Sequence, residues 1–145
     1  MKVLVIGSGG REHAIAYALS KSNKVKELHA IPGNPGISQI ATCHKASVED
    51  LEYILNFVKE ENIDFDSLYT GYLGSADQIE KVKALFKDFK KQGGFTVVDP
   101  VMADNGKLYP GFDLDFVKKM TTLCAVADYI VPNLTEASFM LGVPY

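Results

Sequence analysis

The sequence opens with MKVLVIGSGGREHAIAYAL, residues 1–19, and this stretch decides the fold class. Residues 2–6 form a continuous apolar run, which is typical of a strand buried on both faces of a sheet. A glycine follows at position 7, and residues 11–21 carry apolar side chains at helical spacing. A strand that leads through a glycine turn into a helix is the first unit of a parallel α/β sheet.

The same alternation continues along the chain. After the first strand, the pattern predicts further strands at residues 25–31, 42–46, 65–72, 95–99 and 129–132. It predicts helices at residues 11–21, from an N-cap at Ser47 to about 61, and at 77–92, 113–126 and 135–141. Right-handed crossovers join such units into a doubly wound sheet. We therefore predict one Rossmann-like domain over residues 1–145, a parallel sheet of about six strands in the order 3-2-1-4-5-6 with helices on both faces.

The composition limits the classes of function. The chain has 145 residues and a formal net charge of −3, so it lacks the basic character expected for nucleic-acid binding. No apolar segment approaches the ~20 residues of a membrane span, and the N-terminal run is too short for a signal peptide. Cys43 and Cys124 are far apart and suggest neither a zinc site nor a disulfide. We expect a soluble cytoplasmic protein without a cofactor, either a monomer or a weak homodimer, with neither nucleic acid nor a membrane as partner.

The first candidate site is a glycine loop that would bind a phosphate-bearing small molecule or an anion, formed by Gly7, Ser8, Gly9, Gly10 and Arg11. Backbone N–H groups and the positive end of the following helix favour an anion there. A tight turn from strand to helix needs the same glycines without any ligand, and this alternative stays open. An NAD fingerprint does not fit, because its third position falls on Glu12 and the second strand does not end in an acidic residue.

The first half carries four motifs, which are segment 1–19, PGNPG at 32–36, SVED at 47–50 and FVKEENID at 57–64. With these motifs, residues 1–64 resemble the N-terminal domain of glycinamide ribonucleotide synthetase, a ligase of the ATP-grasp superfamily. The resemblance implies that the glycine loop and the PGNPG turn lie near the phosphoribosyl end of the substrate. The ATP-grasp sequence that the ligase reaction requires does not follow in this chain.

The second half carries different motifs, which are FDSLYTGYLGS at 65–75, VDPVMADNGKLY at 98–109 and IVPNLTEA at 130–137. With these, residues 65–145 resemble pyridoxal/pyridoxamine kinases of the ribokinase-like superfamily. The resemblance implies that Asp99 faces the phosphate and metal end of ATP, and that Asn133 and Glu136 form a magnesium motif. A local alternative is that Asn133 caps the last helix and Glu136 completes a capping box. The G-x-G-D loop that carries the catalytic aspartate of these kinases is not found in the sequence.

Two fragments that meet near residues 64–66, each without its catalytic module, lead us to expect an engineered or recombined chimera. We expect it to have no catalytic residues and no reaction of its own, and to retain anion binding at the glycine loop. One alternative is a domain that binds a phosphoribosyl or nucleotide ligand, and another is a minimal ATP-dependent ligase or kinase. In the binding alternative, a crevice lies where the strand order reverses, between the glycine loop and Gly71, Gly74 and Ser75.

Overall fold

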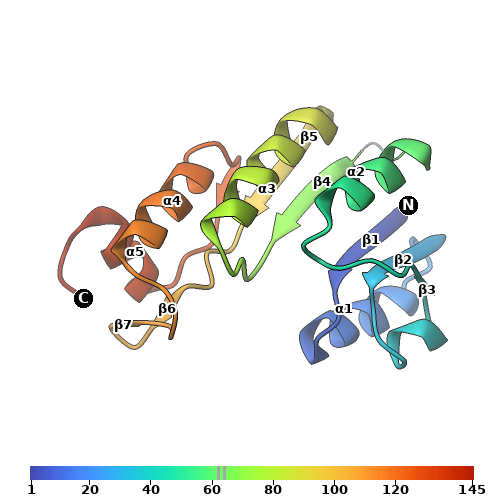
Figure 1. The fold of residues 1–145 in the computed structure, drawn as a ribbon, viewed down its shortest axis with the longest axis horizontal. Coiled ribbons are helices and arrows are strands. Elements are labelled where there is room, and N and C mark those ends of the chain that lie inside the picture. Colours follow the sequence, from blue (N-terminus) through green and yellow to red (C-terminus); the bar gives the residue numbers. More distant parts are fainter. Residues whose placement is uncertain (62, 64) are drawn as a thin grey trace. The chain divides into compact units, whose positions relative to one another are not determined.

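A computed structural model describes residues 1–61, 63 and 65–145 of the chain. Figure 1 shows strands alternating with helices along most of the chain. The chain divides into two compact units, unit 1 at Met1–Ile63 and unit 2 at Asp64–Tyr145.

Unit 1 is built on a three-stranded parallel sheet in the order β1-β2-β3. Its strands are β1 at Lys2–Gly7, β2 at Glu27–Pro32 and β3 at Thr42–Cys43. Strands β1 and β2 pair over their full lengths, and a short 3-10 helix at Ile37–Gln39 follows the turn after β2.

Helices cover both faces of the unit 1 sheet. Helix α1, at Gly10–Ser20, buries Ala16 against Val5 and Ala30, which are register partners on one face. Helix α2, at Leu51–Glu60, places the Phe57 ring against the ring of His29, which lies on the other face. This arrangement is the predicted one for a sheet wound on both sides.

Unit 2 contains a second three-stranded parallel sheet, in the order β4-β5-β8. Its elements are β4 at Phe65–Thr70, α3 at Ala76–Phe89, β5 at Lys90–Val98, α4 at Leu114–Cys124, β8 at Tyr129–Ile130 and α5 at Leu134–Leu141. Helices α3 and α4 pack on one face of this sheet, where Ile79, Met120 and Leu123 are completely buried with Val98 of the central strand.

A small antiparallel hairpin that we did not predict follows β5. Strands β6 at Ala103–Asp104 and β7 at Lys107–Leu108 are joined by Asn105 and Gly106. Both linking residues have positive φ, 50° and 74°, as a two-residue type I′ turn requires. An Asn-Gly pair is a strong signal for such a turn, so the sequence contained the information.

The α/β class and the parallel pairing are confirmed, but the single sheet in the order 3-2-1-4-5-6 is not. The described residues instead form two separate three-stranded parallel sheets, although the strand order within each agrees with the prediction. Periodicity identifies strands one at a time, and it contains no information on whether the first strand pairs with the fourth. The single domain and the seam near residues 64–66 stay predictions.

Several element boundaries differ from the prediction, and two of these differences have a clear physical reason. Asp50, rather than Ser47, is the N-cap of α2, because its carboxylate accepts a hydrogen bond from Tyr53 N at 3.0 Å. Helix α3 ends at Phe89 and not at the predicted residue 92, and Gly93 and Gly94, a pair typical of a helix end, lie inside β5. A side chain at Gly94 would approach the Asp66 carbonyl oxygen to 3.0 Å, so close packing between strands β4 and β5 requires this glycine.

No helix within the described part of the chain is long and apolar enough to cross a membrane.

Candidate functional site

The carboxyl-terminal edge of the unit 2 sheet brings several predicted site residues together. Strands β4, β5 and β8 end in register, with Thr70 opposite Val98 and Val98 opposite Ile130. The ladder continues beyond the strands, since Asp99 N donates to the Thr70 carbonyl oxygen at 3.0 Å. Gly71 and Asp99 therefore follow directly after neighbouring strands at the edge where α/β sheets bind their ligands.

Asp99 is half-buried and its carboxylate is oriented by a phenol. The Tyr69 hydroxyl donates a hydrogen bond to Asp99 Oδ2 at 2.9 Å. Desolvation, followed by this hydrogen bond and the negative charge of Asp99, raises the pKa of the Tyr69 hydroxyl. The phenol therefore stays a proton donor at neutral pH and holds Asp99 in place. We did not predict a role for Tyr69, although it lies in the motif at residues 65–75.

Glu136 and Asn133 hold each other at the start of α5. Asn133 Oδ1 accepts from Glu136 N at 3.0 Å, while Glu136 Oε2 accepts from Asn133 N at 2.9 Å. These are the two hydrogen bonds of a capping box. The other Glu136 oxygen, Oε1, accepts from Met102 N at 2.9 Å, and Asn133 Nδ2 donates to the Ala103 carbonyl at 2.8 Å. The cap thus also binds the segment that follows Asp99.

The three residues of the predicted magnesium motif are not equivalent in the structure. Both carboxylate oxygens of Glu136 accept backbone N–H groups, and its side chain is buried with 2% exposure. The amide oxygen and nitrogen of Asn133 are also engaged, which leaves Asp99 at the open edge. Over residues 1–61, 63 and 65–145, no cluster of three or more His, Cys, Asp or Glu side chains could hold a metal ion. The edge therefore does not fit a metal cage, but Asp99 fits Mg²⁺ that keeps water and phosphate ligands.

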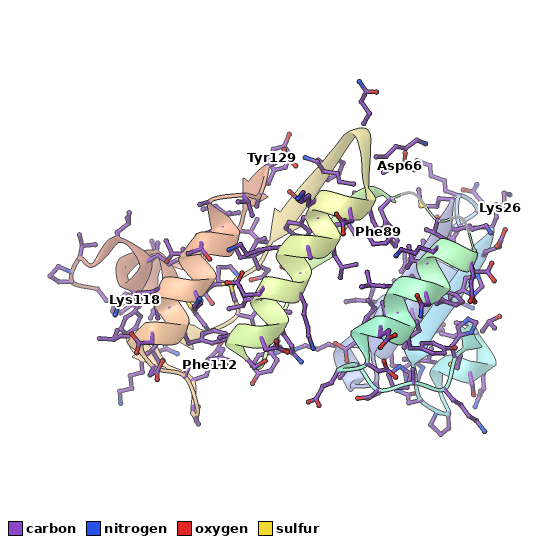
Figure 2. The ribbon with its side chains drawn as sticks, turned by 45° about the horizontal axis from the view of Figure 1, so that its top comes forward. Lys26, Asp66, Phe89, Phe112, Lys118 and Tyr129 are labelled. Carbon is purple, nitrogen blue, oxygen red and sulfur yellow. The ribbon has the colours of Figure 1, made fainter. Side chains whose placement is uncertain are left out.

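The predicted crevice residues of unit 2 lie in the turn between β4 and α3. Ser75 Oγ caps α3 by accepting from Gln78 N at 3.2 Å, and Gly74 N donates to Gln78 Oε1 at 2.7 Å. Gly74 and Ser75 line an open groove of about 660 Å³ that continues to Phe112 and Phe116. Figure 2 shows Phe112 just before the start of α4. The groove lies entirely within unit 2.

The predicted glycine loop of unit 1 is folded around a carboxylate of its own chain. Gly9 N donates to Glu12 Oε2 at 2.7 Å, so the N–H expected to face an anion already has an acidic partner. A side chain at Gly7, where φ is +141°, would lie 2.6 Å from Glu12 Cγ. Gly10 opens α1, and Ser8 and Arg11 are exposed. An anion bound at Gly7–Arg11 would have to displace the Glu12 carboxylate.

The PGNPG turn closes over this loop through Asn34. Asn34 Nδ2 donates to the Ser8 carbonyl at 2.9 Å, and Asn34 Oδ1 accepts from both Gly36 N and Ile37 N at 2.9 Å. The His13 ring lies against Gly36, where an added side chain would come within 2.3 Å of it. The glycine loop and the PGNPG turn therefore form one local structure.

A histidine pair in unit 1 was missed by sequence reasoning. His29 Nδ1 lies 3.0 Å from His44 Nε2, and both rings contact Phe57. Burial, and then the charge of neighbouring His29, lower the pKa of His44, although Glu61 acts in the opposite direction. His29 lies on β2 and His44 directly after β3, the strand that pairs with it, so correct pairing of these strands would have been the signal.

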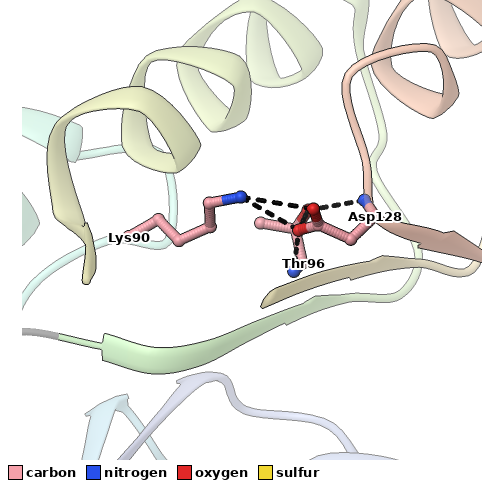
Figure 3. A network of polar contacts seen from close by, with 3 residues as sticks. All are labelled: Lys90, Thr96 and Asp128. Atoms are coloured by element: carbon pink, nitrogen blue, oxygen red, sulfur yellow. Dashed lines mark hydrogen bonds and ion pairs between the residues drawn. The ribbon is translucent and has the colours of Figure 1, made fainter. Parts of the chain in front are cut away.

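A second interaction that the sequence did not predict joins β5 to the turn before β8 (Figure 3). Asp128 Oδ2 accepts from Thr96 N at 2.7 Å, from Thr96 Oγ1 at 2.9 Å and from Lys90 Nζ at 3.0 Å. Asp128 N in turn donates to Thr96 Oγ1 at 3.0 Å. The Lys90 ammonium, followed by the two Thr96 donors, lowers the pKa of Asp128 to about 2. This network connects β5 with the turn that leads into β8, its neighbour in the sheet whose edge carries Asp99.

Unit 2 is thus an α/β sheet with polar loops at the carboxyl ends of its strands, an arrangement typical of enzymes that bind small ligands there. Residues 36–145 match the family model described as phosphomethylpyrimidine kinase. The chain belongs to this family. Residues 1–68 match a second model, described as phosphoribosylglycinamide synthetase, N domain.

Individual relatives agree with both matches. The phosphoribosylamine–glycine ligase of Agrobacterium fabrum is 52% identical over 65 residues, which are 45% of this chain and 15% of the ligase. A Bacteroides thetaiotaomicron protein assigned as a phosphomethylpyrimidine kinase, and solved with pyridoxal, is 30% identical with a TM-score of 0.73 over 99% of this chain and 52% of its own. The pyridoxal kinase of Leishmania donovani, solved with ADP, is 23% identical with a TM-score of 0.66 over 96% of this chain and 51% of its own, and shows the same fold.

These comparisons confirm the two-part resemblance and correct the functional interpretation. The expectation of an engineered, non-catalytic chimera is wrong, because the chain belongs to a kinase family and its relatives along both parts are enzymes. The error came from treating modules that the sequence does not contain as proof of inactivity. The chain spans about half the length of the solved kinases and 15% of the ligase.

Proposed function

We propose that the chain acts in an ATP-dependent kinase, with the carboxyl-terminal edge of the unit 2 sheet facing the magnesium-bound phosphates of the nucleotide. The observation that carries the proposal is Asp99, a half-buried carboxylate at the end of the central strand whose orientation is set by the Tyr69 hydroxyl. A carboxylate in this position suits Mg²⁺ that keeps several water ligands and binds phosphate oxygens. When bound, Mg²⁺ would neutralise negative charge on the phosphate oxygens.

The relatives support a substrate class. The Bacteroides protein was solved with pyridoxal, and the Leishmania kinase of the same fold was solved with ADP. We therefore propose that the acceptor is a small heteroaromatic compound of the pyridoxal or pyrimidine type and that the donor is ATP. The loop after Asp99 and the turn at Gly71–Ser75 would orient the reactants, because they end neighbouring strands of one sheet.

The test is nucleotide binding to the full chain, measured by calorimetry with Mg·ADP and Mg·ATP, together with an assay for ATP-dependent phosphorylation of pyridoxal. Asp99→Asn should weaken Mg·ADP binding about tenfold or more, since it removes a charged partner of the metal. Asp77→Asn is the matched control, because Asp77 forms an exposed ion pair with Lys81 on α3 and should leave binding unchanged. Absence of binding at millimolar nucleotide, or equal binding by the Asp99 variant, would overturn the proposal.

A further inference from the structure

The strongest further observation is the complete burial of the Glu136 carboxylate at the start of α5. Glu136 is 2% exposed, although glutamate is rarely buried unless it is paired. One oxygen binds Asn133 N within its own helix cap, and the other reaches Met102 N, which is 34 positions away in the sequence. A capping role alone would need only the first of these contacts.

The segment that Glu136 reaches is the one that carries Asp99. Val101 adopts a φ of 42°, which is unfavourable for a β-branched residue and persists only where neighbours fix the backbone. Three side chains at the start of α5 form hydrogen bonds with the backbone after Val101. Glu136 binds Met102 N, Asn133 binds the Ala103 carbonyl, and Thr135 Oγ1 accepts from Gly106 N at 3.0 Å. Thr135 is itself buried, with 1% exposure.

We infer that Glu136 is a positioning residue, which fixes the backbone after Asp99, and that it is not a ligand of Mg²⁺. This inference rests on the proposed function, which gives Asp99 its place at the phosphates. The side-chain geometry disagrees with the magnesium role that the N-x-x-E resemblance implies. Both carboxylate oxygens already accept charge-assisted hydrogen bonds from backbone N–H groups, and the buried side chain has no open side for a hydrated ion.

The first test measures amide hydrogen exchange by NMR, on the full chain without nucleotide. Glu136→Gln puts an amide NH₂ where one of the two backbone donors needs an acceptor, so exchange at Met102 or Asn133 should accelerate about tenfold or more. Glu80→Gln is the control, because Glu80 is exposed on α3 and forms surface ion pairs with Lys83 and Lys119. Unchanged exchange in the Glu136 variant would overturn the inference.

A second measurement needs no variant and decides the question if Glu136→Gln fails to fold. Mg²⁺ alone is titrated into the wild-type chain while exchange at Met102 is followed. A metal ligand role would draw the carboxylate away from Met102 N and accelerate exchange, which would refute the positioning role. Unchanged or slower exchange supports it. Should the chain bind no nucleotide, the proposed function fails, while Met102 exchange still reports on what Glu136 does.

Discussion

Thr96→Val tests the link between the unit 2 sheet and the turn before β8. Thr96 is 1% exposed, and valine has nearly the same shape, so the substitution removes the hydroxyl without creating a cavity. Two hydrogen bonds to Asp128 are lost, one donated to its carboxylate and one accepted from its backbone N–H. Losing the hydrogen bonds of one buried hydroxyl costs about 0.5–1.5 kcal/mol when the partner groups can be solvated, and we expect a loss of this size in the unfolding free energy of unit 2 at neutral pH.

The effect of Thr96→Val on stability should depend on pH, and the direction follows from the pKa of Asp128. The pKa of Asp128 is about 2 in the folded state, below its ordinary value of 3.8. A lowered folded-state pKa means that the carboxylate stabilises the fold above about pH 4, and that this contribution disappears as the pH falls through 2. The stability difference between wild type and Thr96→Val should therefore shrink from pH 4 to pH 2. The pKa of Asp128 itself should rise in the variant, because the variant lacks one of its hydrogen-bond donors.

The assay is urea unfolding followed through NMR signals of unit 2, because a chain with two compact units need not unfold in one step. The carboxyl-carbon shift of Asp128 gives its pKa directly. Thr122→Val is the matched control. Thr122 is exposed on α4, where its hydroxyl donates to the Lys119 carbonyl and accepts from Lys83 Nζ at the surface, so its loss should change the stability by less than about 0.5 kcal/mol. Equal stability of Thr96→Val and Thr122→Val, or a wild-type pKa near 3.8, would refute the reasoning.

Two further predictions concern the core and the glycine loop. Leu123→Ala should destabilise unit 2 by about 2–5 kcal/mol because Leu123 is completely buried on α4. Leu114 lies on the same helix and is 60% exposed, so Leu114→Ala should cost far less. Equal urea midpoints of the two variants would contradict this prediction. Inorganic phosphate should raise the melting temperature more in Glu12→Gln than in wild type, because the Glu12 carboxylate accepts the Gly9 N–H and repels anions. Scanning calorimetry measures both shifts, and equal shifts would contradict this prediction.

The fold could be predicted from the sequence wherever the signal was local. The strand at residues 2–6, the helix that follows it and the Asn133 cap each depend on a few neighbouring residues, and the structure contains all three. The boundary of β5 could not be found in this way, because two glycines usually end a helix. Here Gly94 is needed for a close approach to Asp66 on another strand, and that requirement is visible only in three dimensions.

The candidate site was predictable in its position and not in its contacts. Asp99 was identified through the kinase resemblance, which rests on the motif at residues 98–109 and needs no tertiary knowledge. The Tyr69 hydroxyl and the Met102 N–H are partners that the pairing of β4 with β5 and the packing of α5 bring close. Periodicity does not contain these long-range contacts, and the Asp128 network was missed for the same reason.

The N-x-x-E segment shows why a motif alone could not decide its own role. An asparagine followed three positions later by glutamate is both a capping signal and, in the kinase resemblance, a magnesium motif. A capping box turns the glutamate back toward the helix start, and one of its oxygens is then consumed locally. What remains is a single oxygen, whose partner depends on the chain that packs against the cap. In this protein that partner is Met102 N. We therefore infer that Asn133 and Glu136, whose spacing suggests metal ligands, instead fix the loop that follows Asp99.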